Sequence, residues 1–160
     1  MARRVKQRFV HPETRFSEPE ISNYPALADR KRLSGPGLRR FFRIMEKWKV
    51  SARDARLLLG GISSRYYNQL KERQQGRILN QDRLLRVNCI IAIHKALHSL
   101  LPASQANQWA QKVNWEWFHG ATPLAYMIRW DILFVVDLRR RLEKLAQQKK
   151  SENPAKADSL

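Results

Sequence analysis

The sequence predicts an all-α fold, with an N-terminal helix-turn-helix bundle followed by a small C-terminal helical domain. Apolar residues recur at three- and four-residue spacing along much of the chain, which is the period of an amphipathic helix. No segment shows the alternation of apolar and polar residues that is typical of a half-buried strand. The 160 residues suffice for one compact domain or two very small ones, and an apolar fraction of 43% allows a real core.

Residues 1–36 are expected to form a flexible basic arm. They contain four of the seven prolines and no sustained apolar period. The sequence Ser34-Gly35-Pro36-Gly37 is expected to mark the start of the folded part, since Gly and Pro both resist helix formation. From Leu38 onward, apolar residues share one helical face with basic residues opposite, which predicts the first helix.

Residues 37–80 are predicted to be a helix-turn-helix domain. After the first helix, hydroxyl residues at the starts of two shorter helices are typical N-caps. A glycine pair between these helices favours a tight turn, because glycine readily adopts the left-handed conformation. The second helix is expected to begin at Ser51 and end at Gly60-Gly61, and the third to begin at Ser63 or Ser64 and end near Glu72.

Residues 81–146 are predicted to form a second helical domain, and residues 147–160 a polar tail. A Thr-Pro pair opens one of the helices, because Thr at the N-cap and Pro at the first helical position are both favoured. The expected helices run from Asn80 or Asp82 to about Leu101, from Ser104 to about Lys112, from Thr122-Pro123, and from about Asp131 to Ala146. The aromatic segment 114–120 is expected to be turn-like.

Within residues 53–72, three apolar residues, Ile62, Tyr67 and Leu70, are expected to hold one helix against the other. The polar residues between them then face outward, as in a recognition helix that meets base edges. Arg side chains match guanine, and Asn or Gln side chains match adenine, through paired hydrogen bonds. Tyr66 either contacts DNA or packs. The candidate base contacts are Ser64, Arg65, Asn68 and Gln69, and the candidate phosphate contacts are Arg39, Arg40, Arg53, Lys71 and Arg73.

The charge distribution favours a polyanionic partner. The chain carries 31 Lys and Arg against 14 Asp and Glu, a formal net charge of +17, and residues 1–86 hold 21 of these basic and 8 of these acidic side chains. Neutralising phosphates releases counterions, so double-stranded DNA is the first partner to consider. Two alternatives are a basic surface that only favours solubility, and binding to a membrane surface, which is disfavoured because no basic amphipathic helix has a broad exposed apolar face.

The C-terminal half carries a family resemblance. It combines Tyr66-Tyr67 at the end of the helix-turn-helix, the helical sequence 91–98, a helix with Trp109, and a motif with five spaced residues. These motif residues are Asn114, Phe118, Gly120, Pro123 and Leu124. The pattern resembles the Xre/MbcA/ParS antitoxin family over roughly residues 38–143, most specifically over residues 114–124. Where that family commonly has a glycine after the motif, this chain has Trp130.

The resemblance implies a bacterial, cytoplasmic antitoxin that forms a homodimer and associates with the nucleoid when it binds its own operator DNA. Its partner would be a cognate RES-domain toxin, which attacks NAD or uses it for ADP-ribosylation, and the C-terminal domain would cover the NAD pocket of that toxin. The five motif residues are expected to be scaffold. Toxin contacts are placed at Arg139, Arg140 and Arg141, whose charges equally suit a helix C-terminal half through its dipole.

The tryptophan content also favours a homodimer. Trp115 and Trp117, two of the five tryptophans, cannot share one helical face, so aromatic surface is expected to meet a partner. The alternative function is a stand-alone dimeric helix-turn-helix transcriptional regulator without a toxin partner.

An enzyme is not expected. The sequence has no Gly-rich phosphate loop, no nucleophile elbow and no grouped carboxylates. His94 and His98 have a spacing that can chelate zinc, but a third ligand is missing, so neither a metal nor a cofactor is expected. The single cysteine, Cys89, cannot form an internal disulfide. No apolar run suits a signal peptide or a membrane span, so no membrane partner is expected.

Overall fold

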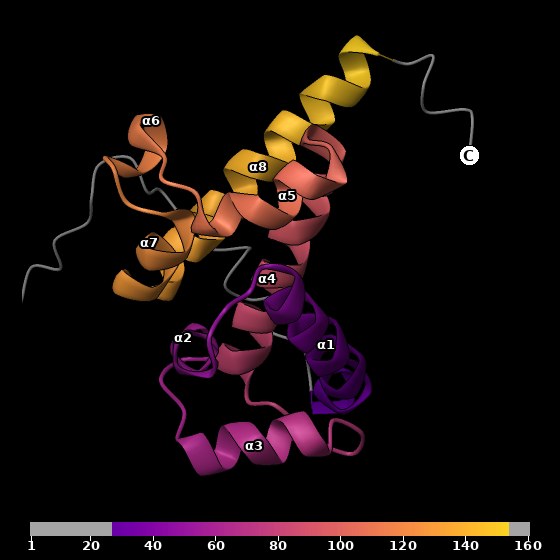
Figure 1. Ribbon diagram of the computed structural model, residues 1–160. Helices are drawn as coiled ribbons and strands as arrows, with labels where there is room; N and C mark the ends of the chain where they lie inside the picture. The colour runs from indigo at the N-terminus through magenta and orange to yellow at the C-terminus, as the bar shows by residue number, and fades with distance from the viewer. Residues whose placement is uncertain (1–26, 154–160) are drawn as a thin grey trace, which may run out of the picture.

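The computed structural model describes residues 27–153, and over this range the chain is all-helical, which confirms the predicted fold class (Figure 1). Neither a strand nor a helix long and apolar enough to cross a membrane occurs among these residues. In chain order the elements are α1 (Leu27–Lys47), α2 (Ala52–Leu58), α3 (Ser64–Glu72), α4 (Gln81–Leu100), α5 (Ala103–Gln108), the 3-10 helix η2 (Trp109–Gln111), α6 (Trp115–Phe118), α7 (Pro123–Arg129) and α8 (Ile132–Glu152).

Helix α4 is the central element of the fold. It packs against both α1 and α8. In Figure 1 the helices α1, α2 and α3 lie towards one end of it, and α5 to α8 towards the other. A helix that is apolar on most sides belongs in a core. The buried side chains of α4 join those of both ends in one apolar cluster, so the boundary expected after residue 80 falls at the start of a shared helix.

Helix α1 corrects the expected start of the folded part. It begins at Leu27, so the expectation that residues 27–36 belong to a flexible arm is wrong. The expected arm residues 1–26 lie outside the described range. The segment Ser34-Gly35-Pro36-Gly37 lies inside this helix, and all of its residues except the proline are buried. Residues that usually interrupt a helix therefore do not end this one.

Close packing explains why small residues occupy this part of α1. The hydroxyl of Ser34 donates a hydrogen bond to the Arg30 carbonyl oxygen (2.6 Å) and accepts one from the backbone N–H of Leu79 (2.9 Å). A Cβ atom at Gly35 would lie 3.3 Å from the backbone oxygen of Gln74. At Gly37 it would lie 3.2 Å from Cγ1 of Val87. Small side chains thus let α1 approach α4 and the segment between α3 and α4 closely.

Helix α1 begins before the predicted Leu38 and α5 has no side-chain cap, but the predicted starts of α2, α3, α4, α7 and α8 are confirmed by side-chain capping bonds. In each case a side-chain oxygen accepts a hydrogen bond from a backbone N–H of the first turn, which satisfies a donor that has no partner within the helix. Where two caps were possible, Ser63 rather than Ser64 caps α3, and Asn80 rather than Asp82 caps α4. The full set of capping residues is Ser51, Ser63, Asn80, Asn114, Thr122 and Asp131.

Two expectations for the C-terminal part need correction. The segment 114–120 contains a short helix, α6, rather than turns alone. Helix α8 extends to Glu152, so residues 147–152 are helical rather than part of a polar tail. Its last turns are held because Ala146 is buried and the ammonium of Lys149 donates a hydrogen bond to the Leu100 carbonyl oxygen (2.9 Å).

Candidate nucleic-acid interface

The turn between α2 and α3 has a well-defined backbone. Gly60 and Gly61 have φ angles of 95° and 76°, the left-handed region that glycine adopts without a Cβ clash. Their backbone N–H groups donate to the carbonyl oxygens of Leu57 and Arg56 at the end of α2. The Arg56 side chain then donates to the carbonyl oxygen of Ile62 (2.9 Å). These bonds fix the path of the turn from α2 to α3, so the two helices and their turn form a helix-turn-helix.

The inner face of α3 is anchored as expected. Ile62 before the helix and Tyr67 within it are each 5% exposed, and Leu70 is fully buried. The ring of Tyr67 packs edge-on against Phe42 of α1, with centroids 5.5 Å apart. Burial raises the pKa of the Tyr67 hydroxyl, so this side chain stays neutral in the core. The three anchors leave the opposite side of α3 free of contacts with the bundle.

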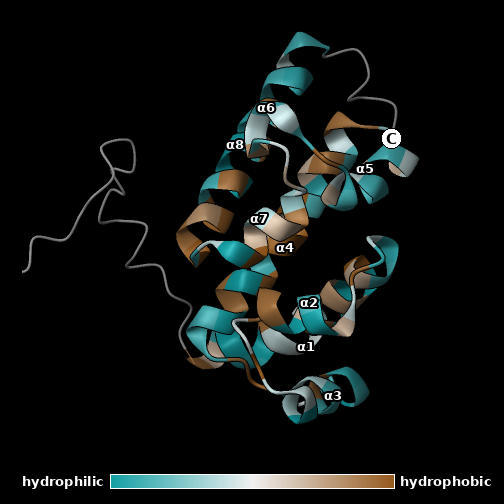
Figure 2. Ribbon diagram, turned by 60° about the vertical axis from the view of Figure 1, so that its left-hand side comes forward, coloured by the Kyte–Doolittle hydropathy of each residue, from teal (hydrophilic) through white to brown (hydrophobic). Residues whose placement is uncertain are grey.

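The outer face of α3 presents polar side chains to solvent. Ser64, Arg65 and Asn68 are exposed, and Gln69 is half-buried. Figure 2 shows α3 at the lower edge of the molecule, with mostly hydrophilic colouring. Arg65 and Asn68 are three residues apart and therefore neighbours on the helix surface. Their donors and acceptors are free for an external partner, since none of them takes part in a side-chain hydrogen bond within the described range.

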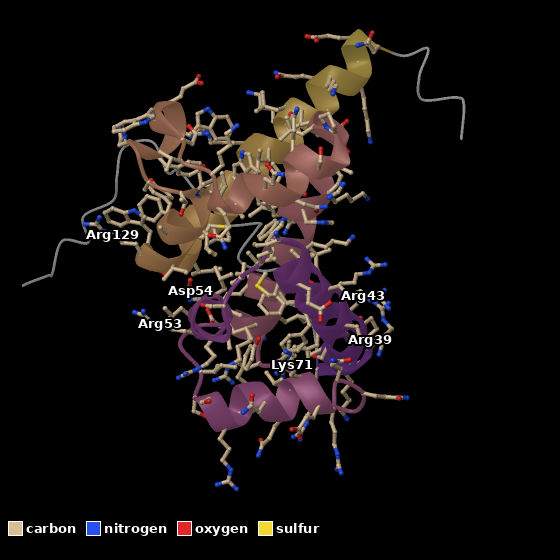
Figure 3. All side chains as sticks on the ribbon, in the orientation of Figure 1. Arg39, Arg43, Arg53, Asp54, Lys71 and Arg129 are labelled. Carbon is tan, nitrogen blue, oxygen red and sulfur yellow. The ribbon has the colours of Figure 1, made fainter. Side chains whose placement is uncertain are left out.

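The candidate phosphate contacts lie on three helices of the N-terminal part. Arg39 and Arg40 are exposed on α1, Arg53 on α2, and Lys71 and Arg73 at the end of α3. Figure 3 shows Arg39 on one side of the molecule and Arg53 on the other. Between residues 27 and 153, ion pairs form only elsewhere, so these five cations and Arg65 have no carboxylate partner there. Unpaired cations on both sides of an exposed helix suit the two phosphate backbones of a groove.

Sequence reasoning missed two residues of this surface. Arg43 is exposed one turn after Arg39 and projects from the same side of α1 in Figure 3. The four-residue spacing could have identified it. Arg83, in the first turn of α4, lies over the ring of Tyr66, with Cζ 5.1 Å from the ring centroid. This contact joins two helices, so no periodicity in the sequence could have revealed it.

The C-terminal motif closes a tight loop around Asn114. The side chain of Asn114 accepts a hydrogen bond from the Trp117 N–H (2.9 Å), and its backbone N–H donates to the Ala121 carbonyl oxygen (3.1 Å). Gly120 has a φ of 88° and lies directly under the Trp115 ring. A Cβ atom there would come within 2.7 Å of Cζ3 of that ring, so a side chain at this position requires the Trp115 ring, which is 77% exposed, to shift.

The other motif residues pack beneath this loop. Phe118 is buried, with its ring centroid 4.8 Å from that of Tyr126 and 6.0 Å from that of Trp109. Pro123 and Leu124 are also buried. The five motif residues therefore shape the segment between η2 and α7, and each of them is buried or half-buried.

The three consecutive arginines of α8 do not form one patch. Arg139 is half-buried, bonds to Glu143 (3.2 Å) and interacts with the thiol of Cys89 on α4. Arg141 instead lies over the ring of Trp117, with Cζ 4.4 Å from the centroid. Arg140, between them, is half-buried and also has an interaction within the protein. Consecutive helical residues point about 100° apart, which is why three neighbours in sequence reach different surroundings.

The two candidate zinc-binding histidines face each other on α4. The rings of His94 and His98 have centroids 4.3 Å apart, and Nε2 of His98 lies 3.2 Å from Oδ1 of Asn107. Among residues 27–153, no three His, Cys, Asp or Glu side chains are grouped as a metal site requires. Burial raises the pKa of the Cys89 thiol, which keeps it protonated in the core.

Together, these observations define an all-helical protein with a helix-turn-helix whose second helix is exposed and flanked by cations. No protein-family model matches the chain, and no solved structure matches it. A protein of Sinorhizobium fredii (strain NBRC 101917 / NGR234), named "Uncharacterized protein y4oB", is 31% identical over 107 residues, which are 66% of this chain and 81% of that protein. The chain belongs to the same family as this protein.

Proposed function

We propose that this protein is the DNA-binding antitoxin of a type II toxin-antitoxin system. It binds its own operator through α3, and its C-terminal part neutralises a RES-domain toxin that consumes NAD or uses it for ADP-ribosylation. The observation that carries the proposal is the unpaired polar and basic surface around α3. The toxin partner rests on the resemblance of residues 114–124 to the Xre/MbcA/ParS antitoxin family. The protein acts as a homodimer in the bacterial cytoplasm and joins the nucleoid when bound to DNA.

Base recognition follows from the outer face of α3. With its inner face anchored, the helix enters the major groove with its N-terminal residues nearest the bases, as in other helix-turn-helix proteins. Arg65 donates two hydrogen bonds to O6 and N7 of a guanine, and Asn68 pairs with an adenine. Ser64 and Gln69 complete the base contacts. A good bidentate contact discriminates against the wrong base by about 1–3 kcal/mol.

Phosphate binding is supported by the cations that flank α3. Arg39 and Arg40 approach one backbone from α1, and Arg53 approaches the other from α2. Lys71 and Arg73 add contacts at the end of α3. Each phosphate contact releases counterions, so affinity should fall on the order of a thousandfold or more between 50 and 200 mM salt if about 6–10 contacts form. A flat salt response would contradict this part of the proposal.

Toxin inhibition needs no chemistry in this chain, because covering a substrate pocket is enough to stop an enzyme. Arg141 with Trp117 offers an aromatic and cationic contact on the outside of α8. Arg, Trp and Tyr are enriched among residues that dominate protein interfaces. Arg141 is therefore a better candidate for the toxin contact than Arg139, which is bonded to Glu143.

The test of toxin inhibition is co-purification with the product of the adjacent gene, followed by an assay of NAD loss with and without this protein. A stable complex that stops NAD loss is the expected result. The variant Arg141→Ala should weaken inhibition, while the matched variant Lys144→Ala, one turn further along α8 and also exposed, should leave it unchanged. No complex and no inhibition would refute the toxin part.

The alternative is a stand-alone dimeric helix-turn-helix transcriptional regulator. The observation that favours it is that all three expected toxin contacts, Arg139, Arg140 and Arg141, already make interactions inside the protein. The two functions differ in one result. A regulator would bind DNA with the same salt dependence but would rescue no toxin.

A further inference from the structure

Three large apolar side chains are exposed together where α7 meets α8. Trp130, Leu133 and Phe134 are 42%, 48% and 41% exposed, and we refer to them as the α7–α8 patch. The rings of Trp130 and Phe134 have centroids 5.1 Å apart, so the aromatic surface is continuous. In Figure 2 the first turns of α8 carry the brown colour of hydrophobic residues. Adjacent exposed apolar residues of this size mark an interaction surface more often than isolated ones do.

Opposite charges flank the α7–α8 patch. The guanidinium of Arg129 lies over the Trp130 ring, with Cζ 5.4 Å from the centroid. Asp137 is exposed one helical turn after Leu133, and neither charge has an ion-pair partner between residues 27 and 153. In a two-fold interface the same patch meets itself in reverse orientation. The cation at one edge of the first copy then faces the carboxylate at the opposite edge of the second copy, and the apolar centre lies between the two such pairs.

The charge of the whole chain points to the same surface. Residues 87–160 carry 10 Lys and Arg against 6 Asp and Glu, whereas residues 1–86 carry 21 against 8. Two copies that meet through their C-terminal halves therefore bring less net positive charge close together than two copies that meet through their N-terminal halves. Like charge opposes association, so the C-terminal half, which holds the α7–α8 patch, is the more favourable half for contact with a second copy.

The position of the patch is also compatible with two recognition helices on one face. Helix α7 packs against α2. In Figure 1 the junction of α7 and α8 lies on the same side of the molecule as α2 and the N-terminal end of α3. A two-fold axis on this side that runs parallel to the direction in which α3 faces would place a second α3 beside the first, with both outer faces directed the same way. Dimeric helix-turn-helix proteins bind two half-sites with this arrangement.

We infer that the α7–α8 patch is the surface through which two copies of this chain form a two-fold dimer. Trp130, Leu133 and Phe134 of both copies form the apolar centre, and Arg129 of each copy faces Asp137 of the other. This inference deepens the proposed function, because it assigns the homodimer a surface. The dimer itself does not depend on DNA.

The mass of the full chain in solution, measured by light scattering across a concentration series, tests this surface. Leu133→Glu should weaken the dimer about tenfold or more, because it places two carboxylates in the apolar centre. Leu145→Glu is the matched control, since Leu145 lies on the same helix, is 39% exposed and is about 18 Å further along the axis. Circular dichroism of both variants checks that they are folded. A monomeric wild-type chain, or equal weakening by both folded variants, overturns the inference.

Charge reversal provides a second test that does not introduce a charge into the apolar centre. Arg129→Glu and Asp137→Lys should each weaken the dimer, and the double variant should recover affinity because both contacts are restored with reversed sign. A double variant weaker than either single variant would overturn the predicted pairing.

Binding of operator DNA separates this inference from the proposed function. If Leu133→Glu is monomeric and the wild-type chain is a dimer that binds no DNA, the dimer surface stands and the DNA-binding proposal fails. If the wild-type chain binds DNA as a monomer, the dimer surface fails and DNA binding stands.

Discussion

The guanidinium of Arg83 stacks on the ring of Tyr66, with Cζ 5.1 Å from the ring centroid. Arg83 lies in the first turn of α4, and Tyr66 in the first turn of α3. The contact therefore joins the N-terminal end of the proposed recognition helix to the central helix of the fold. Because α4 also packs against α1 and α8, this pair connects the exposed helix to the most extensively packed element.

Replacing Arg83 tests this contact. A cation–π contact contributes about 0.5–1 kcal/mol at an exposed site, so Arg83→Ala should lower the free energy of unfolding by about that amount. It should also weaken DNA binding, because the start of α3 becomes less well held. Thermal unfolding and gel-shift titration measure the two effects. Arg83→Lys keeps the charge but loses the planar stacking group, so an intermediate result would separate stacking from charge.

Base and phosphate contacts should respond differently to mutation. Arg65→Ala should relax the preference for the operator over unrelated DNA by about 1–3 kcal/mol. Arg39→Ala should weaken binding to all sequences alike and reduce the slope of log affinity against log salt by about 1. Titrations of operator and scrambled DNA at several salt concentrations distinguish them. Identical effects of the two variants would contradict the assigned roles.

The hydroxyl of Ser34 should stabilise the fold through a tertiary hydrogen bond. Ser34→Ala removes the acceptor of the buried Leu79 N–H and should cost about 1–3 kcal/mol of unfolding free energy. Ser99→Ala is the control, because Ser99 also donates to the carbonyl oxygen four residues earlier but makes no tertiary bond among the described residues. Urea unfolding of both variants compares them, and a loss no larger for Ser34 would refute the role of the tertiary bond.

Replacing Gly120 should destabilise the fold through both its backbone and its neighbour. Gly120→Ala strains a φ of 88° and drives the new methyl group into the Trp115 ring. Gly76→Ala is the matched control, since Gly76 has a φ of 78° and no atom within 4 Å of a Cβ position. The control should cost about 1–2 kcal/mol for the strained backbone alone, and Gly120→Ala should cost that amount plus the loss of the contact that the exposed Trp115 ring makes with this turn. Chemical denaturation measures both values.

The stability of the fold should fall in mild acid because of His94. Burial, together with the nearby charges of His98 and Lys47, lowers the pKa of His94 to about 4 from its ordinary 6.5. The unfolded chain therefore binds a proton here that the folded chain does not, and stability decreases as pH falls from about 6.5 to about 4.

The variant His94→Gln should show a smaller decrease over the same pH range. His119→Asn, at an exposed position, should behave like the wild-type chain. Urea midpoints at intervals between neutral pH and pH 4 measure the difference. Parallel curves for wild-type and His94→Gln would contradict the prediction.

The helix caps show how much of this fold the sequence determined by itself. Ser51, Ser63, Asn80 and Thr122 each bond a backbone N–H three residues further along. Such a bond depends only on the local chain, so these four helix starts and the all-α class could be predicted, whereas the start of α1 at Leu27 was not. The inward positions of Tyr67 and Leu70 followed in the same way from helical periodicity.

Tertiary contacts decided the rest. The Ser34–Gly37 segment stays helical because other parts of the chain approach it closely, and nothing local in the sequence reports that approach. Packing of distant elements also separates Arg139, which interacts with Cys89 of α4 besides its local bond to Glu143, from Arg141, which lies over the ring of Trp117. Local hydrogen bonds thus determined where the capped helices begin, whereas the packing of distant elements decided how far α1 extends and which residues are buried, paired or left free for a partner.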